Sequence, residues 1–319
     1  MAARSRKSVA RPDLRRLRTE QPNPAARDLD CKSALEIVRI INAEDETVAR
    51  AVRKALPQIA RAVDLIVAGI REGGRLIYVG AGTSGRLGAL DASEIPPTFG
   101  IASSTVQFII AGGPRALAAE TEASEDSAEL GRAEMARRKP SRKDVIVGIA
   151  ASGRTPFAIA ALHYARSRGA RTIALTCNRD SPLERAAHLA VVTEVGPEVL
   201  AGSSRMKAGT AHKMVLNMLS TAAMARLGFV YGNLMVRVDP RNEKLVQRAI
   251  AILEQATGAD RKAASLALKA AGNRTPVALV MLAAGVSRAR SVAALKQTHG
   301  HVRKAIARAE STGGEKIPG

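Results

Sequence analysis

The sequence has few of the residues that build disulfide frameworks, metal sites or base-stacking surfaces. It contains two cysteines, no tryptophan and only 2% aromatic residues. Cys31 and Cys177 lie far apart, and no histidine or cysteine stands at metal-ligand spacing from either. The sequence therefore gives no indication of a disulfide framework or a zinc site, and we expect both cysteines to be reduced packing residues.

Long hydrophobic runs are also absent. No stretch approaches the roughly 20 uninterrupted apolar residues that a membrane span needs. The N-terminus, MAARSRKSVARPDLRRLR, lacks the apolar segment of a secretory signal. With 319 residues, 46% of them hydrophobic, the chain can nevertheless bury a full core. We therefore expect a cytoplasmic protein with no membrane partner, made of one large α/β domain and a smaller appendage.

Acidic residues are in the minority, with 29 Asp and Glu against 49 Lys and Arg and a formal net charge of +20. Such an excess can indicate nucleic-acid binding, but most of it is dispersed along the chain and few aromatic residues are present for base stacking. We interpret the basic N-terminal residues as a solvated arm and expect no nucleic-acid partner. The residues of this arm are Arg4, Arg6, Lys7, Arg11, Arg15, Arg16 and Arg18.

The pattern of apolar residues predicts a doubly wound α/β fold. Apolar positions recur every three or four residues from 45 to 70, which predicts one amphipathic helix that Gly73 and Gly74 end. Five short apolar runs then alternate with helical stretches, as in a five-stranded parallel sheet covered on both faces. The predicted strands are residues 76–79, 106–110, 145–149, 172–176 and 189–193. Ligands should bind at the carboxyl ends of these strands.

The last third of the chain reads as helical. Residues 203–227 predict a long, mostly buried helix that ends at Gly228. After residue 240 the sequence predicts a small all-helical C-terminal region, with helices near 243–257, 261–271, 275–284 and 287–296.

Two glycine- and hydroxyl-rich loops follow predicted strands at the same edge of the sheet. Residues 80–86 read GAGTSGR and follow the first strand, and residues 150–156 read AASGRTP and follow the third. Neither is a Walker loop or a dinucleotide fingerprint. A structural turn without a ligand is the alternative, but two such loops flanking one crevice favour a phosphate that is held and not transferred. The candidate binding residues are Gly82, Thr83, Ser84, Gly85, Ser152, Gly153, Arg154 and Thr155.

These loops resemble those of the sugar isomerase (SIS) domain. Within that class, four segments resemble the N-acetylmuramic acid 6-phosphate etherases, and the resemblance runs from Leu17 through the C-terminal region. The segments are GAGTSGRLGALDASEIPPTFG (80–100), VGIAASGRTP (147–156), GSSRMKAGTAHK (202–213) and GNLM (232–235). The chain departs from the family pattern in its basic arm, at Pro114 and at His212, where a smaller or amide side chain is expected.

The resemblance implies two catalytic carboxylates, Glu94 and Glu125. The residues alone favour Glu94 weakly, because it lies among apolar residues before a Pro-Pro helix stop, where burial would raise its pKa. They do not separate Glu125 from its acidic neighbours Glu120, Glu122, Asp126 and Glu129.

The implied reaction is loss of D-lactate from C3 of a ring-opened sugar, followed by addition of water. One carboxylate removes the C2 proton and the other protonates the leaving oxygen. We assign Glu125 as the base and Glu94 as the acid. The chemistry needs no metal ion and no organic cofactor.

Spacing along one helix suggests how the site is assembled. If Ser84 opens a continuous helix, Glu94 lies ten residues on, about 15 Å along the axis, which is longer than a hexose 6-phosphate. Either the helix breaks near Gly88, or Glu94 serves the phosphate site of a second subunit. We expect a homodimer with shared active sites.

A third loop could also meet the substrate. Residues 202–207 precede the long helix, and their N–H groups and basic side chains could receive the lactyl carboxylate. The alternative is a capped core helix with solvated basic residues. The candidates in this loop are Ser203, Ser204, Arg205 and Lys207.

The resemblance suggests a division into four regions: a basic arm (1–30), an SIS-type sugar-phosphate-binding catalytic domain with leading helices (31–238), a helical region (239–310) and a flexible tail (311–319). An aldose-ketose isomerase and a non-catalytic sugar-phosphate sensor similar to glucokinase regulatory protein are alternative functions. Lactate release would exclude the isomerase. The sensor has a second SIS copy, whereas this chain has no internal repeat of its loops.

Overall fold

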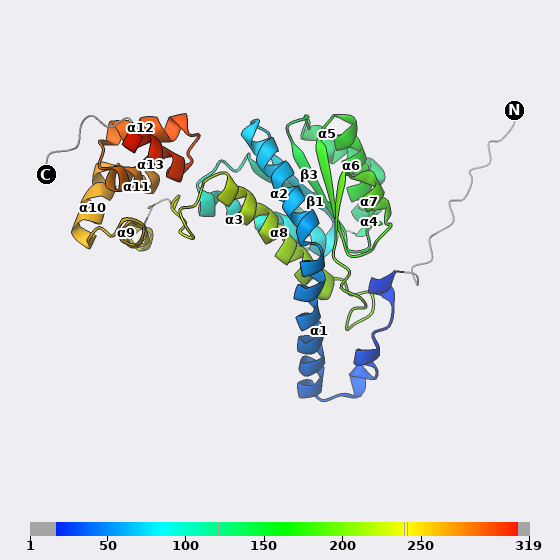
Figure 1. Cartoon of the computed structure of the whole chain (residues 1–319). Helices are drawn as coiled ribbons and strands as arrows, with labels where there is room; N and C mark the ends of the chain where they lie inside the picture. The colour runs from blue at the N-terminus through cyan, green and yellow to red at the C-terminus, as the bar shows by residue number, and fades with distance from the viewer. Residues whose placement is uncertain (1–16, 120–121, 239, 241, 312–319) are drawn as a thin grey trace, which may run out of the picture.

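The computed structural model describes residues 17–119, 122–238, 240 and 242–311 (Figure 1). Most of the predicted basic arm and nearly all of the predicted tail lie outside the described residues. The described end of the region predicted as a solvated basic arm (1–30) packs on the sheet domain from Leu17 onward. Leu17 and Thr19 are buried, and the Gly202 N–H donates to the Thr19 carbonyl at 3.2 Å. Three short 3-10 helices follow: η2 (Arg18–Glu20), η3 (Pro24–Ala26) and η4 (Leu29–Cys31).

The predicted helix over 45–70 is two helices, α1 (Ala34–Lys54) and α2 (Leu56–Arg71). The prediction of one helix was wrong because Pro57 lies within the apolar stripe. Proline has no N–H to donate to the carbonyl four residues earlier, and Pro57 lies in the first turn of α2, where that bond is not needed. Ser33 and Glu36 form a capping box that fixes the start of α1.

The five predicted strands are confirmed as one parallel sheet with the strand order β2-β1-β3-β4-β5. Gly80 at the end of β1 pairs with Ile110 of β2 and with Ile149 of β3, so the carboxyl ends of these three strands are level. The strands are β1 (Leu76–Gly80), β2 (Val106–Ile110), β3 (Val145–Ile149), β4 (Arg171–Thr176) and β5 (Leu189–Val192).

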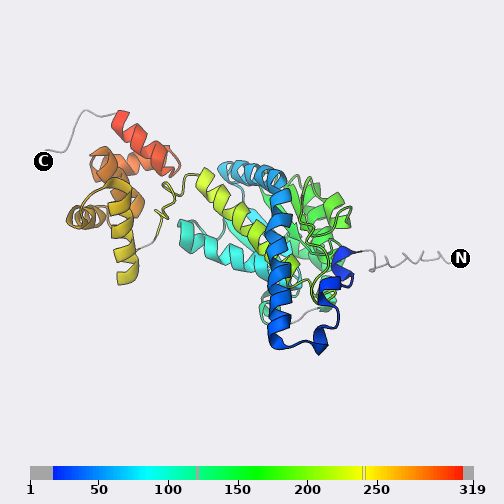
Figure 2. The same ribbon diagram turned by 60° about the horizontal axis from the view of Figure 1, so that its bottom comes forward.

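Helices cover both faces of the sheet, which explains why the strands β1 and β3 are apolar throughout. Tyr78 and Val147 point into a core shared with one layer of helices, whereas Ile77 and Ile146 point into a core shared with the other. The first layer contains α2, α3 (Gly82–Phe99) and α8 (Lys207–Arg226), with α3 packed beside α8 (Figures 1 and 2). The second layer contains α5 (Ala128–Arg137), α6 (Pro156–Ser167) and α7 (Pro182–Ala186).

Two helix ends differ from those expected. Helix α3 passes through Pro96 and Pro97 and ends at Gly100, which has a left-handed φ of 59°. Helix α8 begins at Lys207 and not at Ser203, because the residues before it form turns. Gly228 follows α8 in a left-handed conformation, as predicted for the end of that helix.

The C-terminal helices form a cluster of their own beyond the end of α8 (Figures 1 and 2). They share an apolar core to which Val236 and Val238 of the preceding segment contribute. The four predicted helices are present, and α13 was not predicted. The helices are α9 (Glu243–Thr257), α10 (Arg261–Ala270), α11 (Thr275–Ala284), α12 (Arg288–Gln297) and α13 (Val302–Ser311).

Within the described part of the chain, no single helix has the length and hydrophobicity to span a membrane. The α11 and α12 pair passes that test only when taken together, and it is bent by 108°.

Candidate active site

The loop after β1 leads directly into the N-terminus of α3. The first helical hydrogen bond runs from the Gly85 N–H to the Ala81 carbonyl at 3.0 Å, so the N–H groups of the three preceding residues point along the helix axis. No side chain caps this helix among the described residues. A Cβ on Gly85 would lie 2.7 Å from Ile110 Cγ1, so the glycine allows the helix to start close to the sheet. An uncapped helix start of this kind suits an anion.

The loop after β3 lies at the same edge of the sheet and also has a constrained shape. Gly153 has a φ of 66°, and a Cβ there would lie 2.4 Å from Ser181 Oγ. The Arg154 N–H donates to Ser152 Oγ at 3.1 Å. The Arg154 Nε is buried and has no hydrogen-bond partner among the described residues. A buried donor without a partner is costly, so this nitrogen is suited to an acceptor on a ligand.

Glu125, at the end of α4 (Glu122–Glu125), connects these two loops. The Thr155 hydroxyl donates to Glu125 Oε1 at 2.9 Å, and Thr155 is itself buried. The other carboxylate oxygen lies 4.0 Å from the position of a Cβ on Gly82. Sequence spacing could not separate Glu125 from its acidic neighbours, whereas these contacts set it beside both candidate phosphate loops.

Glu94 is not part of this cluster within one chain. Helix α3 is unbroken from Gly82 to Phe99, so Glu94 lies ten residues beyond Ser84, about 15 Å along the axis. The break that we considered near Gly88 is absent, and a Cβ on Gly88 would lie 3.1 Å from Tyr78 Cβ, so this glycine allows close packing on β1. Glu94 is exposed, and the expectation that its own chain buries it was wrong.

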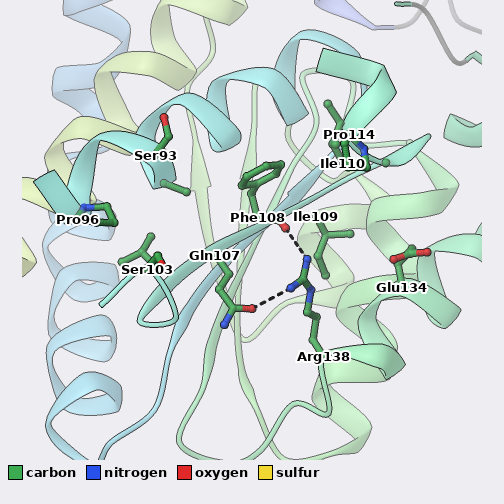
Figure 3. Close-up of a pocket in the computed structure, with 13 residues that line it drawn as sticks. Ser93, Pro96, Ser103, Gln107, Phe108, Ile109, Ile110, Pro114, Glu134 and Arg138 are labelled. Carbon is green, nitrogen blue, oxygen red and sulfur yellow. Dashed lines mark hydrogen bonds between the residues drawn. The ribbon is translucent and has the colours of Figure 1, made fainter. Parts of the chain in front are cut away.

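Two cavities lie near the second half of α3. Glu94 lines a cavity of about 620 Å³ together with Pro97 and Arg248 of α9. A further cavity of about 460 Å³ runs along the edge strand β2 and includes Ser93 and Pro96 (Figure 3). Neither cavity includes a residue of the two candidate phosphate loops.

The third candidate loop is arranged differently from our expectation. Glu198 accepts hydrogen bonds from the N–H groups of Lys207 at 2.8 Å and Ala208 at 2.9 Å, so the start of α8 is already capped. Lys207 Nζ lies 2.5 Å from Glu44 Oε2, and its side chain is only 3% exposed. The Lys207 side chain is therefore buried and already paired, and a role for it in substrate binding stays a prediction. The capped helix start agrees with the alternative of a core helix, although that alternative expected solvated basic residues and Lys207 is buried.

The other residues of that loop lie near the site. Ser203, Ser204 and Arg205 form the turns before α8, and none of the three is buried. A Cβ on Gly209, in the first turn of α8, would lie 3.5 Å from Thr83 Cγ2 and 3.6 Å from the Ser204 carbonyl oxygen. The loop thus lies close to the start of α3, and a role for these three residues in substrate binding stays a prediction.

His212 is a neighbour of the site that sequence reasoning did not place there. Its Nδ1 lies 3.4 Å from Ser84 Oγ, and its ring is buried. The one signal in the sequence was that position 212 departs from the family pattern, in which a smaller or amide side chain is expected. Among the described residues, no group of three or more His, Cys, Asp or Glu side chains is placed to hold a metal ion.

Comparison with known proteins first gives the class. The model of the glucokinase regulatory protein N-terminal SIS domain matches residues 58–166, and that of the SIS domain matches residues 132–222. Phosphoheptose isomerase from Francisella tularensis has a TM-score of 0.47 at 17% sequence identity, over 61% of this chain and 100% of that protein. The sheet, the two loops and the model matches define an SIS-domain protein.

Sequence relatives then give the family. N-acetylmuramic acid 6-phosphate etherase from Actinobacillus pleuropneumoniae serotype 7 is 51% identical over 293 residues, which cover 92% of this chain and 96% of that protein. The protein of the same name from Symbiobacterium thermophilum is 58% identical over 275 residues, covering 86% of this chain and 91% of the relative. The chain belongs to the N-acetylmuramic acid 6-phosphate etherase family.

Proposed function

We propose that this protein is a carbon-oxygen lyase that cleaves the D-lactyl ether of N-acetylmuramic acid 6-phosphate. The products are N-acetylglucosamine 6-phosphate and D-lactate. Membership of the family supports the substrate, and the position of Glu125 beside both candidate phosphate loops is the observation that carries the proposal. A phosphorylated sugar does not cross a membrane unaided because its charge is costly to desolvate, so the activity implies a cytoplasmic location.

The phosphate serves as a handle. The N–H groups at the start of α3, the hydroxyls of Ser84 and Ser152 and the guanidinium of Arg154 supply its hydrogen bonds. None of these groups needs to move during the reaction, so the sugar is held with its reacting carbons near Glu125.

The reaction has two stages, elimination and hydration, that use the same two carboxylates. In the ring-opened sugar the C1 aldehyde acidifies the C2 proton, which Glu125 removes. The electron pair left on C2 forms the C2=C3 double bond, the C3–O bond breaks, and Glu94 protonates the departing lactate oxygen. Water then adds its oxygen to C3 of the unsaturated aldehyde and gives a proton to the Glu94 carboxylate, while Glu125 returns its proton to C2. Acid and base catalysis each contribute roughly 10²- to 10⁴-fold to such steps.

The distance between the two glutamates within one chain motivates a homodimer. Glu94 is exposed and lies about 15 Å along α3 from Ser84, so it does not reach a sugar whose phosphate is bound at its own Ser84. A two-fold axis would bring Glu94 of each chain to the loops of the other. Each active site then contains the loops and Glu125 of one protomer and Glu94 of its partner.

Release of D-lactate from N-acetylmuramic acid 6-phosphate tests the activity. Wild type and a Glu129→Gln control, altered at an exposed glutamate of α5, should release lactate at the same rate, whereas Glu125→Gln should be slower by at least about 100-fold. Conversion of the substrate to a ketose without lactate would support an isomerase instead. Binding without any conversion would support a sensor.

The two carboxylates have separable roles. In deuterated water, Glu94→Gln should still exchange the C2 proton of the substrate while releasing little lactate, because the base is intact. Loss of exchange in this variant would overturn the assignment of Glu94 as the acid.

Mixing two inactive variants tests the shared site. In a mixed dimer of Glu94→Gln and a Ser84→Ala/Ser152→Ala chain, one of the two sites receives only intact residues. Random exchange of chains should therefore recover about a quarter of wild-type activity. If dimers form and no activity returns, the two glutamates do not come from different chains.

A further inference from the structure

A buried chain of polar side chains stands behind the hydroxyl of Ser84. His212, on the second turn of α8, has Nδ1 3.4 Å from Ser84 Oγ and Nε2 3.7 Å from Cys177 Sγ. The Cys177 sulfur in turn lies 3.5 Å from Thr193 Oγ1. Cys177, Thr193 and His212 are all buried, so the chain begins in the core and ends at a candidate phosphate-binding residue.

Both central groups are neutral at physiological pH. Burial lowers the pKa of His212 to about 4, and no carboxylate is bonded to its ring among the described residues. Burial also raises the pKa of the Cys177 thiol to about 12, against a smaller opposing effect of the hydrogen bond with Thr193. The imidazole therefore has one N–H and one acceptor nitrogen, and the sulfur keeps its proton.

Two directions of hydrogen bonding are open to this chain. Either Cys177 donates to Nε2 and Nδ1–H donates to Ser84, or Ser84 donates to Nδ1 and Nε2–H donates to the sulfur. A bare imidazole nitrogen is a good acceptor, whereas a thiol sulfur is a weak one. The bare imidazole nitrogen is the acceptor in both directions, and the first is the one in which the thiol proton points to it while the Thr193 hydroxyl donates to the Thr176 carbonyl at 3.4 Å. The first direction also leaves the hydroxyl proton of Ser84 free to point to a ligand.

We propose that His212 is a positioning residue that donates Nδ1–H to Ser84 Oγ and so directs the Ser84 hydroxyl proton toward the bound sugar phosphate. The proposal rests on the proposed function, which makes Ser84 a phosphate ligand. Cys177 supports it by donating to Nε2, which fixes the tautomer of the ring. An amide at position 212 could fill the same role, because it has one acceptor and a donor.

The tautomer gives a test that does not depend on activity. Long-range ¹H–¹⁵N correlation spectra of the full-length protein, with the His212 signals assigned by their loss in His212→Gln, should show Nδ1 protonated and Nε2 bare. A neutral imidazole that is free in solution is not held in this single tautomer. A ring with Nε2 protonated, or a doubly protonated ring at pH 7, would overturn the proposal.

Binding and kinetics give the second test. His212→Leu should weaken binding of N-acetylglucosamine 6-phosphate in calorimetry and raise KM for the substrate, each about tenfold, while kcat changes less than twofold. His212→Gln should restore most of the affinity, and Cys177→Ala should weaken binding about threefold. If His212→Leu does not fold, the affinity of Cys177→Ala relative to that of wild type still tests the proposal. Equal affinity of all the folded variants would overturn the proposal.

The two claims can fail separately. If wild type releases no D-lactate but the variants lose affinity as stated, the proposed function fails and the role of His212 stands. If wild type releases lactate and the variants bind the product as wild type does, the role of His212 alone fails.

Discussion

The ion pair between Lys207 and Glu44 should be a major stabilising contact of the sheet domain. The side chains are 3% and 19% exposed, and the Lys207 Nζ and Glu44 Oε2 atoms are 2.5 Å apart. Asn23 also donates to Glu44 at 2.9 Å, so this carboxylate joins the N-terminal segment, α1 and α8. Replacement of Glu44 by glutamine leaves the buried ammonium without a counter-charge.

Removal of one partner of a buried pair costs about 3 to 5 kcal/mol. We take the lower end, about 3 kcal/mol, because Glu44 is partly exposed and water can reach the remaining ammonium. That loss corresponds to a roughly 150-fold change in the equilibrium constant for unfolding. Urea unfolding at pH 7, followed by circular dichroism, should show it as a lower midpoint for Glu44→Gln.

A matched control is Glu46→Gln, at an exposed position of the same helix, which should change the free energy of unfolding by less than about 0.5 kcal/mol. Burial would raise the pKa of Glu44, but hydrogen bonds from Lys207 and Asn23 outweigh it and lower that pKa. The stabilisation is therefore present above the unfolded pKa of about 4.3 and is lost as pH falls through the lowered folded value. A Glu44→Gln protein as stable as the control at pH 7 would refute this reasoning.

Three further changes have defined outcomes. Burial raises the pKa of Asp91 despite its hydrogen bonds. The stability that this group contributes is therefore present below about pH 4 and is lost as pH rises through the raised pKa. In urea titrations, Asp91→Asn should remove this pH dependence. A Cβ on Gly228 would lie 2.2 Å from His301 Cγ, so Gly228→Ala should lower the free energy of unfolding by about 2 kcal/mol in the same assay. Thr155→Val removes the hydrogen bond that orients Glu125 and should lower kcat about tenfold with little change in KM; an unchanged kcat would count against that role.

Local patterns sufficed to predict the sheet. The strands β1 and β3 are buried on both faces, so each of them appears in the sequence as a continuous apolar run. The prediction from apolar patterns failed where the effect of a single residue is not visible in the helical repeat. Pro57 divides a continuous apolar stripe into two helices, whereas Pro96 and Pro97 lie within α3 without ending it. Helix α13 was missed because alanines supply half of its buried face, which includes Ala305 and Ala309.

The site was only partly predictable, because its contacts join distant parts of the chain. The glycine- and serine-rich loops could be located from the sequence, since they directly follow strands. The sequence could not show that Lys207 pairs with Glu44, 163 residues away, or that His212 stands behind Ser84. Helix geometry alone predicted the distance between Ser84 and Glu94, and the unbroken α3 agrees with that distance.

The central claim is that lactate is eliminated and that water is then added. The most direct test follows the oxygen atom of that water into the two products. The measurement is mass spectrometry of both products after wild-type turnover of N-acetylmuramic acid 6-phosphate in ¹⁸O-labelled water. Because the C3–O bond breaks and water adds to C3, we predict unlabelled D-lactate and N-acetylglucosamine 6-phosphate with ¹⁸O at C3. Label in the lactate, or no lactate at all, would contradict the account.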